Sequence, residues 1–332
     1  MTGSARDVGG QNAPGTRVTV SVCIVTCNQE RYVRQCIESV LAGSVGIDIE
    51  VLVGDDRSVD GTGAIVAALA AEHAGIVFHQ RNDPRMGVCA NLRSLLVRAR
   101  GAFIAVLDGD DYWLPGKLAA QLAWLEADPE CMAVYTNAVA VTESGQLIGR
   151  FNDVGDARMD LGFLLRRGNF LHSGSVLMRS VLAAGLIGIE GRYIDYRAHL
   201  AHACSGPLRH IGRPFTAYRV GSAGSLVAGA NAMVRELYWE AIQSVPRERV
   251  ADDDYARGLA DFLRRVFFRA LRTRDLALWR EWKPRVFAAS PHGAPKMAWL
   301  TAANILRMLA KQAAGRFRRD ASGKRLRVLY PR

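Results

Sequence analysis

Short apolar runs alternate with amphipathic stretches over the first 125 residues of the chain. Residues 18–25, 49–56, 76–80 and 102–107 are rich in β-branched and other apolar side chains, which predicts four buried strands. Between them, residues 29–43, 58–75 and 86–101 carry apolar positions at helical spacing, which predicts three helices. Strands and helices in alternation form a mostly parallel sheet with crossover helices, so we predict a Rossmann-like α/β fold.

The pattern is less regular after residue 113. Residues 114–129 predict an amphipathic helix, and residues 131–141 predict a further strand. Residues 143–160 are polar and rich in glycine and aspartate, and we predict a loop region there.

The composition changes again near residue 245. Residues 254–275 and 296–319 each place apolar side chains on one face and arginines on the other, which predicts two basic helices, and the last nine residues predict a short basic tail. The net charge of +11 arises here, since residues 245–332 hold 21 Lys and Arg against 8 Asp and Glu, whereas residues 1–244 hold 22 against 24. Such helices either lie in an anionic membrane interface or pack against the rest of the protein, and the sequence leaves both open.

The bulk composition narrows the class of protein. Of 332 residues, 49% are hydrophobic and 23% are charged, which is typical of a globular chain. The six cysteines form no CxxC pair, which favours a reducing compartment. Residues 1–16 are small and polar, predict a disordered lead-in, and contain no signal-peptide core. We expect a cytoplasmic protein, or one held peripherally on the cytosolic face of a membrane. No nucleic-acid motif accompanies the basic tail, so we expect no nucleic-acid partner.

Three carboxylates crowd the end of the fourth predicted strand. Asp108, Asp110 and Asp111 fall within four positions directly after a buried apolar run. Their mutual repulsion and loss of hydration are costly unless a cation lies among them. Hard divalent ions such as Mg²⁺ or Mn²⁺ prefer oxygen ligands, so the cluster predicts a metal that also binds a phosphorylated ligand. The alternative is a solvated acidic turn.

Polar residues also follow the first two strands. Thr26 and Asn28 come after the first strand, and Asp55 and Asp56 end the second. Parallel sheets bind ligands beyond the carboxyl ends of their strands, where these residues and the three carboxylates should meet. The chain contains neither GxGxxG after its first strand nor GxxxxGK[ST], so we expect a metal to hold the phosphates.

Four sequence blocks carry a resemblance to a known family. These are VSVCIVTCNQERYV, EVLVGDDRSVDGT, the Gly87 and Asn91 of MGVCANLRSLLVRARG, and FIAVLDGDDYWLPGKL. In order and spacing they resemble the inverting family 2 glycosyltransferases, whose nucleotide-sugar-binding domain has the type A fold. The blocks span about residues 18–125, and a weaker likeness extends to about residue 225.

The resemblance implies roles for residues on the donor side. Val25, Thr26 and Asn28 would line the nucleobase pocket, and Asp56 would hydrogen-bond the base. The family usually has an aromatic residue where Cys27 stands, so the identity of the base is open, with a UDP-sugar as the first expectation.

The same resemblance implies roles for the three crowded carboxylates. Asp108 would face the ribose or the metal shell, and Asp110 would bind the divalent ion that bridges the donor's phosphates. Asp111 would support both. Asp108 and Asp110 are thus the implied metal ligands.

On the acceptor side the resemblance is looser. Residues 169–186 are similar to a strand and helix of the family and bring His172 near the acceptor. Residues 188–203 resemble the block that carries an acidic pair and then a helix. The second acid corresponds to Asp195, which would be the catalytic base, although Ile194 replaces the first acid. Glu190 is the reserve candidate, and residues 217–226 resemble the loop that closes over the donor.

These observations predict a metal-dependent inverting transferase with three regions. Residues 17–244 would form the catalytic domain, divided into a nucleotide-sugar half (17–125) and an acceptor half (126–244), and residues 245–332 would form a basic helical region. The expected acceptor is a saccharide or a lipid-linked glycan in cell-surface polysaccharide or glycolipid synthesis. The alternatives are a transferase-like scaffold without turnover and a nucleotidyltransferase, whose glycine-rich phosphate loop the segment TCNQERY does not provide.

Overall fold

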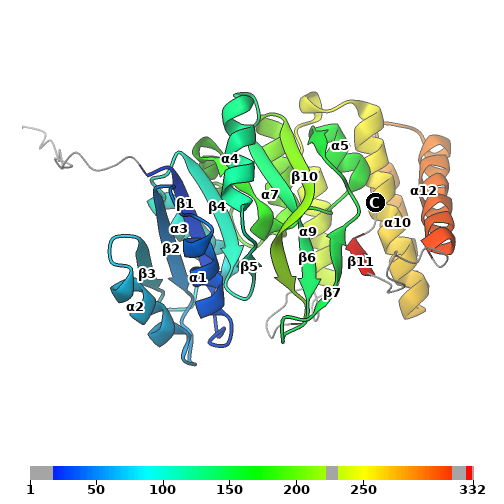
Figure 1. The fold of residues 1–332 in the computed structure, drawn as a ribbon. Coiled ribbons are helices and arrows are strands. Elements are labelled where there is room, and N and C mark those ends of the chain that lie inside the picture. The colour runs from blue at the N-terminus through cyan, green and yellow to red at the C-terminus, as the bar shows by residue number, and fades with distance from the viewer. Residues whose placement is uncertain (1–17, 222–230, 316–326, 331–332) are drawn as a thin grey trace, which may run out of the picture.

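The structure is a computed structural model that describes residues 18–221, 231–315 and 327–330. Eleven strands of these residues form one sheet, with the order β11-β7-β6-β9-β4-β1-β2-β3 along its main path (Figure 1). The predicted lead-in at residues 1–16 lies outside the described residues. The mostly parallel α/β fold predicted from the sequence is confirmed.

The first half of the sheet follows the predicted alternation. Its four parallel strands are β1 (Val20–Thr26), β2 (Ile49–Asp55), β3 (Val77–Arg81) and β4 (Phe103–Asp108). The helices between them are α1 (Val33–Ala42), α2 (Thr62–Glu72) and α3 (Val88–Arg98).

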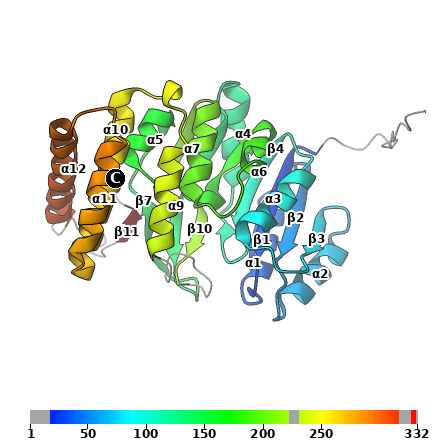
Figure 2. The ribbon, with the colours of Figure 1, turned by 180° about the vertical axis from the view of Figure 1, so that it is seen from behind.

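Both faces of β1, β2 and β4 are buried, because successive side chains point into two different cores. Val22 and Ile24 of β1 pack in the core beneath α1, α2 and α4 (Lys117–Ala127). Cys23 and Val25 pack in the second core, on the face that α3, α6 (Ala183–Ile187), α7 (Asp195–Ser205) and α9 (Asn231–Gln243) cover (Figure 2).

The second half is more irregular than predicted. Its strands are β5 (Tyr112–Trp113), β6 (Ala133–Val141), β7 (Leu147–Asn152), β8 (Ala157–Met159), β9 (Leu177–Arg179) and β10 (Leu208–Arg219), and α5 spans Leu161–Arg167. The prediction of a loop region over residues 143–160 was wrong, since β7 and β8 lie there. The buried side chain of Asn137 in β6 donates to the backbone oxygen of Asn152 in β7 and accepts from the Asn152 backbone N–H, so a polar side chain holds this pairing together.

The C-terminal helices are part of the same body. They are α10 (Asp252–Thr273), α11 (Leu276–Ala288) and α12 (Ala294–Gly315). Leu259, Phe262 and Leu263 of α10 are buried in the core that α7 and the sheet share, so α10 packs against the rest of the protein. No helix in the described ranges is both long and apolar enough to cross a bilayer.

The end of the chain returns to the sheet. Part of the predicted basic tail forms β11 (Arg327–Tyr330), which pairs in parallel with β7, so the description of this segment as only a tail was wrong. Figure 1 shows β11 beside β7, at the edge of the sheet nearest the C-terminal helices. Residues 222–226 of the predicted closing loop and residues 316–319 of the second predicted basic helix lie outside the described residues.

Candidate active site

The carboxyl ends of β1, β2 and β4 lie along one edge of the sheet. The strand register pairs Thr26 of β1 with Asp55 of β2, and Val25 of β1 with Asp108 of β4. The two groups of aspartates are therefore on either side of β1. Val25 and Thr26 are buried and their backbone oxygens accept from Gly109 N and Asp56 N, whereas Cys27 is partly accessible and Asn28 is exposed.

Asp56 is held by a loop that follows β3. Its carboxylate accepts hydrogen bonds from the backbone N–H groups of Met86 and Gly87, at 2.7 and 2.8 Å, and from Asn82 Nδ2 at 3.2 Å. Arg85 Nε lies 3.6 Å from Asp56 Oδ2. Burial raises the pKa of Asp56, but these donors outweigh it and bring the pKa below its ordinary value.

Asn28 ties the end of β1 to the turn after β2. This residue adopts φ 54°, in the left-handed region that asparagine tolerates. Its side-chain Oδ1 accepts from Val59 N at 2.9 Å, and its backbone N–H donates to Ser58 Oγ at 2.9 Å. The Cys27 thiol donates to the backbone oxygen of Asp56 at 3.3 Å.

The carboxylates after β4 lie in an electrostatic environment opposite to that of Asp56, because negative charges surround them. Burial, followed by the charges of Asp111, Asp110 and Asp195, raises the pKa of Asp108 well above its ordinary value. Burial and Asp110 likewise raise the pKa of Asp111, although Arg219 opposes them. Asp111 Oδ2 is buried and accepts no hydrogen bond from the described residues. This crowding of negative charge is what a bound cation would relieve.

Arg219, at the end of β10, holds the loop of these carboxylates. Its backbone N–H donates to Asp111 Oδ1 at 2.8 Å and its Nε donates to the backbone oxygen of Asp110 at 2.9 Å. The guanidinium lies over the Tyr32 ring, 4.4 Å from its centre, and donates to Gln35 Oε1 at 2.9 Å. No local pattern in the sequence points to this residue, because these partners are more than 100 residues away along the chain.

His172 lies directly behind Asp111. Its Nε2 is 3.1 Å from Asp111 Oδ2, and its ring packs against Phe151 and Tyr218. Burial lowers the pKa of His172 to about 4, although the charges of Asp195 and Asp110 act in the other direction. The imidazole is therefore neutral near pH 7, and with 4% of its surface exposed it supports Asp111.

Two buried polar side chains of α4 hold the turn that carries His172. Lys117 Nζ donates to Gln121 Oε1 at 2.8 Å and to the backbone oxygen of Val176 at 3.4 Å. Gln121 Nε2 donates to the backbone oxygen of Ser175 at 2.8 Å. Burial lowers the pKa of Lys117 to about 7. The sequence pattern singles out neither residue, because it indicates only that this helix is amphipathic.

Asp195 is the first residue of α7 and faces the same cluster. Asp195 is exposed as a residue, but its carboxylate loses part of its hydration, which raises its pKa, while nearby His172 lowers it. The charge of Asp195 in turn raises the pKa values of Asp108 and Asp111. The structure thus brings together the candidate base and the candidate metal ligands, which are 85 or more residues apart in sequence.

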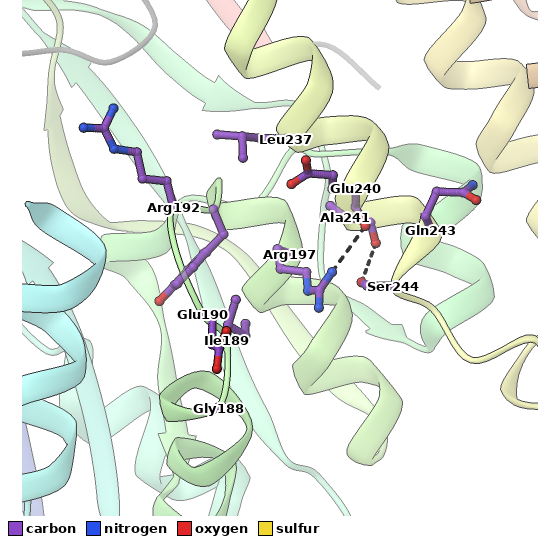
Figure 3. Close-up of a pocket in the computed structure, with 11 residues that line it drawn as sticks. Gly188, Ile189, Glu190, Arg192, Arg197, Leu237, Glu240, Ala241, Gln243 and Ser244 are labelled. Atoms are coloured by element: carbon purple, nitrogen blue, oxygen red, sulfur yellow. Dashed lines mark hydrogen bonds between the residues drawn. The ribbon is translucent and has the colours of Figure 1, made fainter. Parts of the chain in front are cut away.

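Glu190, the reserve candidate, lies elsewhere. It lines a pocket of about 540 Å³ between the segment before α7 and helix α9, together with Arg192, Arg197 and Glu240 (Figure 3). Arg197 closes one side of this pocket by donating to the backbone oxygen of Glu240 at 3.3 Å. Neither Asp195 nor the aspartates after β4 line it, so Glu190 is separate from the carboxylate cluster.

The residues present fit a divalent ion that a ligand helps to coordinate. Within the described residues, no three His, Cys, Asp or Glu side chains are arranged to hold a metal alone. Asp108 and Asp110 offer hard oxygen donors, and Asp111 adds a buried carboxylate oxygen that contacts His172 Nε2 at 3.1 Å but accepts no hydrogen bond from the described residues. Mg²⁺ and Mn²⁺ commonly take one or two carboxylates and complete their shell with phosphate oxygens and water.

Comparison with known proteins identifies relatives of this arrangement. Residues 21–183 match the family model described as "Glycosyl transferase family 2". The uncharacterized protein Rv1520 of Mycobacterium tuberculosis is 29% identical over 202 residues, which are 60% of this chain and 58% of that protein. A chondroitin synthase of Escherichia coli is 31% identical over 129 residues, which are 39% of this chain and 18% of that enzyme. The chain spans less than two thirds of either relative.

Solved structures share the fold. Residues 1–349 of TarS from S. aureus, in complex with UDP-GlcNAc, superpose with a TM-score of 0.59 at 14% identity, over 82% of this chain and 92% of that chain. The same protein in complex with UDP gives a TM-score of 0.57 at 17% identity, over 92% and 95% of the two chains.

Proposed function

The chain belongs to family 2 of the glycosyltransferases, and we propose that it moves a sugar from a nucleoside diphosphate to an acceptor hydroxyl with inversion at the anomeric carbon. The observation that carries this proposal is the position of Asp195, at the start of α7, where its charge raises the pKa values of Asp108 and Asp111 after β4. A displacement of this kind needs a base on the acceptor side and charge neutralisation on the leaving-group side.

The donor nucleotide would bind along the ends of β1 and β2. Asp56 Oδ2 accepts one hydrogen bond, from Gly87, and so retains a lone pair for an N–H group of the base. Asn28 and Cys27 would border the base. With the base at Asp56 and the diphosphate at the carboxylates after β4, the ribose would lie between them and near Asp108. A UDP-sugar is the first donor to test, and the TarS complexes with UDP and UDP-GlcNAc support that choice at the level of the fold.

Asp110 and Asp108 would hold a divalent ion between the protein and the donor diphosphate. When bound, that ion supplies Lewis-acid neutralisation of the leaving diphosphate. Asp111, fixed by Arg219 and His172, would keep the two ligands in position.

Asp195 would accept the proton of the acceptor hydroxyl. As that oxygen forms a bond to the anomeric carbon, the bond from this carbon to the diphosphate oxygen breaks, and the electron pair leaves with the diphosphate. The raised pKa of Asp195 suits this role, because a carboxylate that is less acidic than usual is a stronger base. An α-linked donor would give a β-linked product.

We propose that this transfer takes part in the synthesis of a saccharide polymer or a glycolipid. The likeness to a chondroitin synthase supports a saccharide acceptor, and a lipid-linked glycan is the alternative acceptor. We also propose peripheral attachment to the cytosolic face of a membrane. Trp299, Leu306 and Leu309 of α12 are exposed, at 65, 66 and 46% of their surface, in a region of net positive charge.

The membrane proposal is tested with vesicles of phosphatidylcholine and phosphatidylglycerol. Sedimentation of the full chain with these vesicles should fall when Trp299, Leu306 and Leu309 are replaced by Gln, and should not fall for Val181→Gln, an equally exposed apolar residue on another surface. Equal sedimentation of both variants would contradict it. Point substitutions are preferable to removing the C-terminal helices, since α10 contributes to the main core.

The catalytic proposal is tested by screening nucleotide sugars for Mn²⁺-dependent hydrolysis and transfer, with Asp110→Asn as the control. Wild-type turnover that disappears in Asp110→Asn supports it, and an α-linked product from an α-linked donor, seen by NMR, refutes inversion. A scaffold without turnover is the second candidate, favoured by Cys27 and Ile194 at positions where the family has other residues. Nucleotide binding with Mn²⁺ but no hydrolysis or transfer of any donor would favour the scaffold.

A further inference from the structure

The C-terminal strand brings an aromatic residue to the wall of the site. β11 pairs with β7 so that Tyr330 is opposite Asn152, and the Tyr330 ring lies 4.7 Å from the ring of Phe151. The last described residue of the chain is thus next to a residue that packs on His172, at a ring distance of 4.9 Å.

This pairing depends on a glycine. Gly149 of β7 is opposite Arg327, and a Cβ added at Gly149 would overlap the backbone oxygen of Arg327. Any other residue at position 149 would push β11 away from β7. The close approach of the two strands therefore requires this glycine.

Four rings form a continuous cluster behind and beside Asp111. Phe151 contacts both His172 and Tyr218, at ring distances of 4.9 and 5.4 Å, and His172 contacts Tyr218 at 5.1 Å. Phe151 and His172 are buried, whereas Tyr218 and Tyr330 remain partly accessible. The two tyrosines are therefore the members of this cluster that a ligand can touch.

The tyrosines border the carboxylates on the side away from the nucleotide. The Tyr218 ring lies 5.1 Å from the ring of His172, whose Nε2 is 3.1 Å from Asp111 Oδ2, and the next residue, Arg219, donates its backbone N–H to Asp111 Oδ1. Burial, Tyr330 and the charges of the three aspartates raise the pKa of the Tyr218 hydroxyl, in agreement with this position. In the sheet, β4 lies between β1 and β2 on one side and β6, β7 and β11 on the other. A donor bound over β1 and β2 leaves the β7 and β11 side to the second substrate.

We infer that Tyr330 and Tyr218 form a sugar-binding subsite for the acceptor, an inference that rests on the proposed transferase function. The C–H groups on one face of a pyranose are weakly positive and pack well on the negative face of an aromatic ring. The phenol hydroxyls supply the hydrogen bonds that sugar hydroxyls require. In this arrangement the C-terminal strand helps to select a saccharide acceptor and holds it beside Asp195 and Asp110.

The test is binding of simple glycosides to the full chain by saturation-transfer NMR. The probes are the methyl β-glycosides of glucose, galactose and N-acetylglucosamine. Wild type should bind at least one of them, and Tyr330→Ala should weaken that binding by about twofold to tenfold, as expected for loss of one aromatic contact. Tyr330→Phe keeps the ring but loses the hydroxyl, so its glycoside affinity should lie between those of wild type and Tyr330→Ala.

Gly149→Ala provides a second route to the same loss, because it displaces β11 and Tyr330 while leaving both tyrosine side chains unaltered. It should weaken glycoside binding as Tyr330→Ala does, whereas Gly185→Ala, with no atom near the added Cβ, should not. Unchanged binding in Tyr330→Ala, or no binding of any probe by wild type, overturns the inference. The affinity for UDP in the presence of Mn²⁺, measured by calorimetry on the same variants, separates the acceptor subsite from the donor assignment. This affinity should be the same in all of these variants. If wild type does not bind UDP, the donor assignment alone is contradicted.

Discussion

The aspartates at the ends of β2 and β4 lie on either side of β1, but they differ in what surrounds them. Asp56 accepts three hydrogen bonds from a loop, and its pKa is lowered. Asp108 and Asp111 face each other and further acids, and their pKa values are raised. The same side chain at the same edge of one sheet is therefore stabilised as a carboxylate in one place and destabilised in the other.

The difference identifies what each end of the sheet needs from a ligand. The β2 end already has its donors, so a ligand there adds hydrogen bonds to a formed structure. The β4 end has Arg219 as the main source of positive charge among its described contacts, and it gains most from a cation. Variants that remove one charge at a time should separate these two roles.

The largest effect is expected for Asp110→Asn. Loss of a group that stabilises charge in the transition state costs about 10²- to 10³-fold in kcat, and the apparent affinity for Mn²⁺ should fall. Without metal, the free energy of unfolding should stay the same or rise, because one of several repelling charges is gone. Mn²⁺ titrations of activity and thermal unfolding in EDTA measure both. Metal-independent turnover by wild type would contradict this assignment.

Asp195→Asn should follow, with a loss of about 10²-fold in kcat. As the base, Asp195 acts only when deprotonated, so wild-type kcat/KM should fall as the pH drops through its pKa. Because that pKa is raised, the acid limb should lie above the ordinary aspartate value of 3.8. The limb should be absent from the residual activity of the variant. An unchanged pH profile in Asp195→Asn would show that another group is the base.

Asp56→Asn should lower stability more than activity. The new amide presents N–H donors to the N–H groups of Met86 or Gly87, which loses hydrogen bonds at a buried site and costs about 2 kcal/mol of unfolding free energy. Urea denaturation measures the change. Asp83→Asn is the matched control, since this carboxylate belongs to the same loop and is 77% exposed. If Asp56→Asn were as stable as Asp83→Asn, the contrast between the two strand ends would not hold.

The parts of the fold that could be predicted from the sequence are those with local patterns. β2 and β4, which lead to Asp56 and Asp108, are mostly apolar because both of their faces are buried, with Glu50 as the charged residue inside β2. β7 was not predicted, because Asn152 and Gly149 stabilise it through partners on other strands. β10 was not predicted, because Gly212 and Pro214 interrupt its apolar pattern, and its register against β6 shifts at Pro214. α11 was not predicted either, because it contains Pro284, and proline disfavours the interior of a helix.

The residues of the candidate site also divide into those that a local sequence pattern reveals and those that only the fold reveals. Asp108, Asp110 and Asp111 lie within four positions of the chain, so the sequence alone reveals that they are crowded. Arg219 and Tyr330 are brought to these carboxylates only by the pairing of distant strands, and neither belongs to a motif. Residues that act through long-range packing need the fold before they can be recognised.

The smallest effect is expected for Cys27→Tyr, which tests the nucleotide end of the comparison. Cys27 is partly accessible beside Asp56, at a position where the family usually has an aromatic residue. Stacking of a base on an aromatic ring contributes about 1–3 kcal/mol, so even partial stacking should lower the donor KM by about threefold to tenfold with little change in kcat. Calorimetry with UDP gives the affinity directly, and Cys27→Ser, which adds no ring, should leave it unchanged. If the tyrosine variant binds UDP no better than the serine variant, the base does not lie against residue 27, and Asp56 would then have to recognise it from another direction.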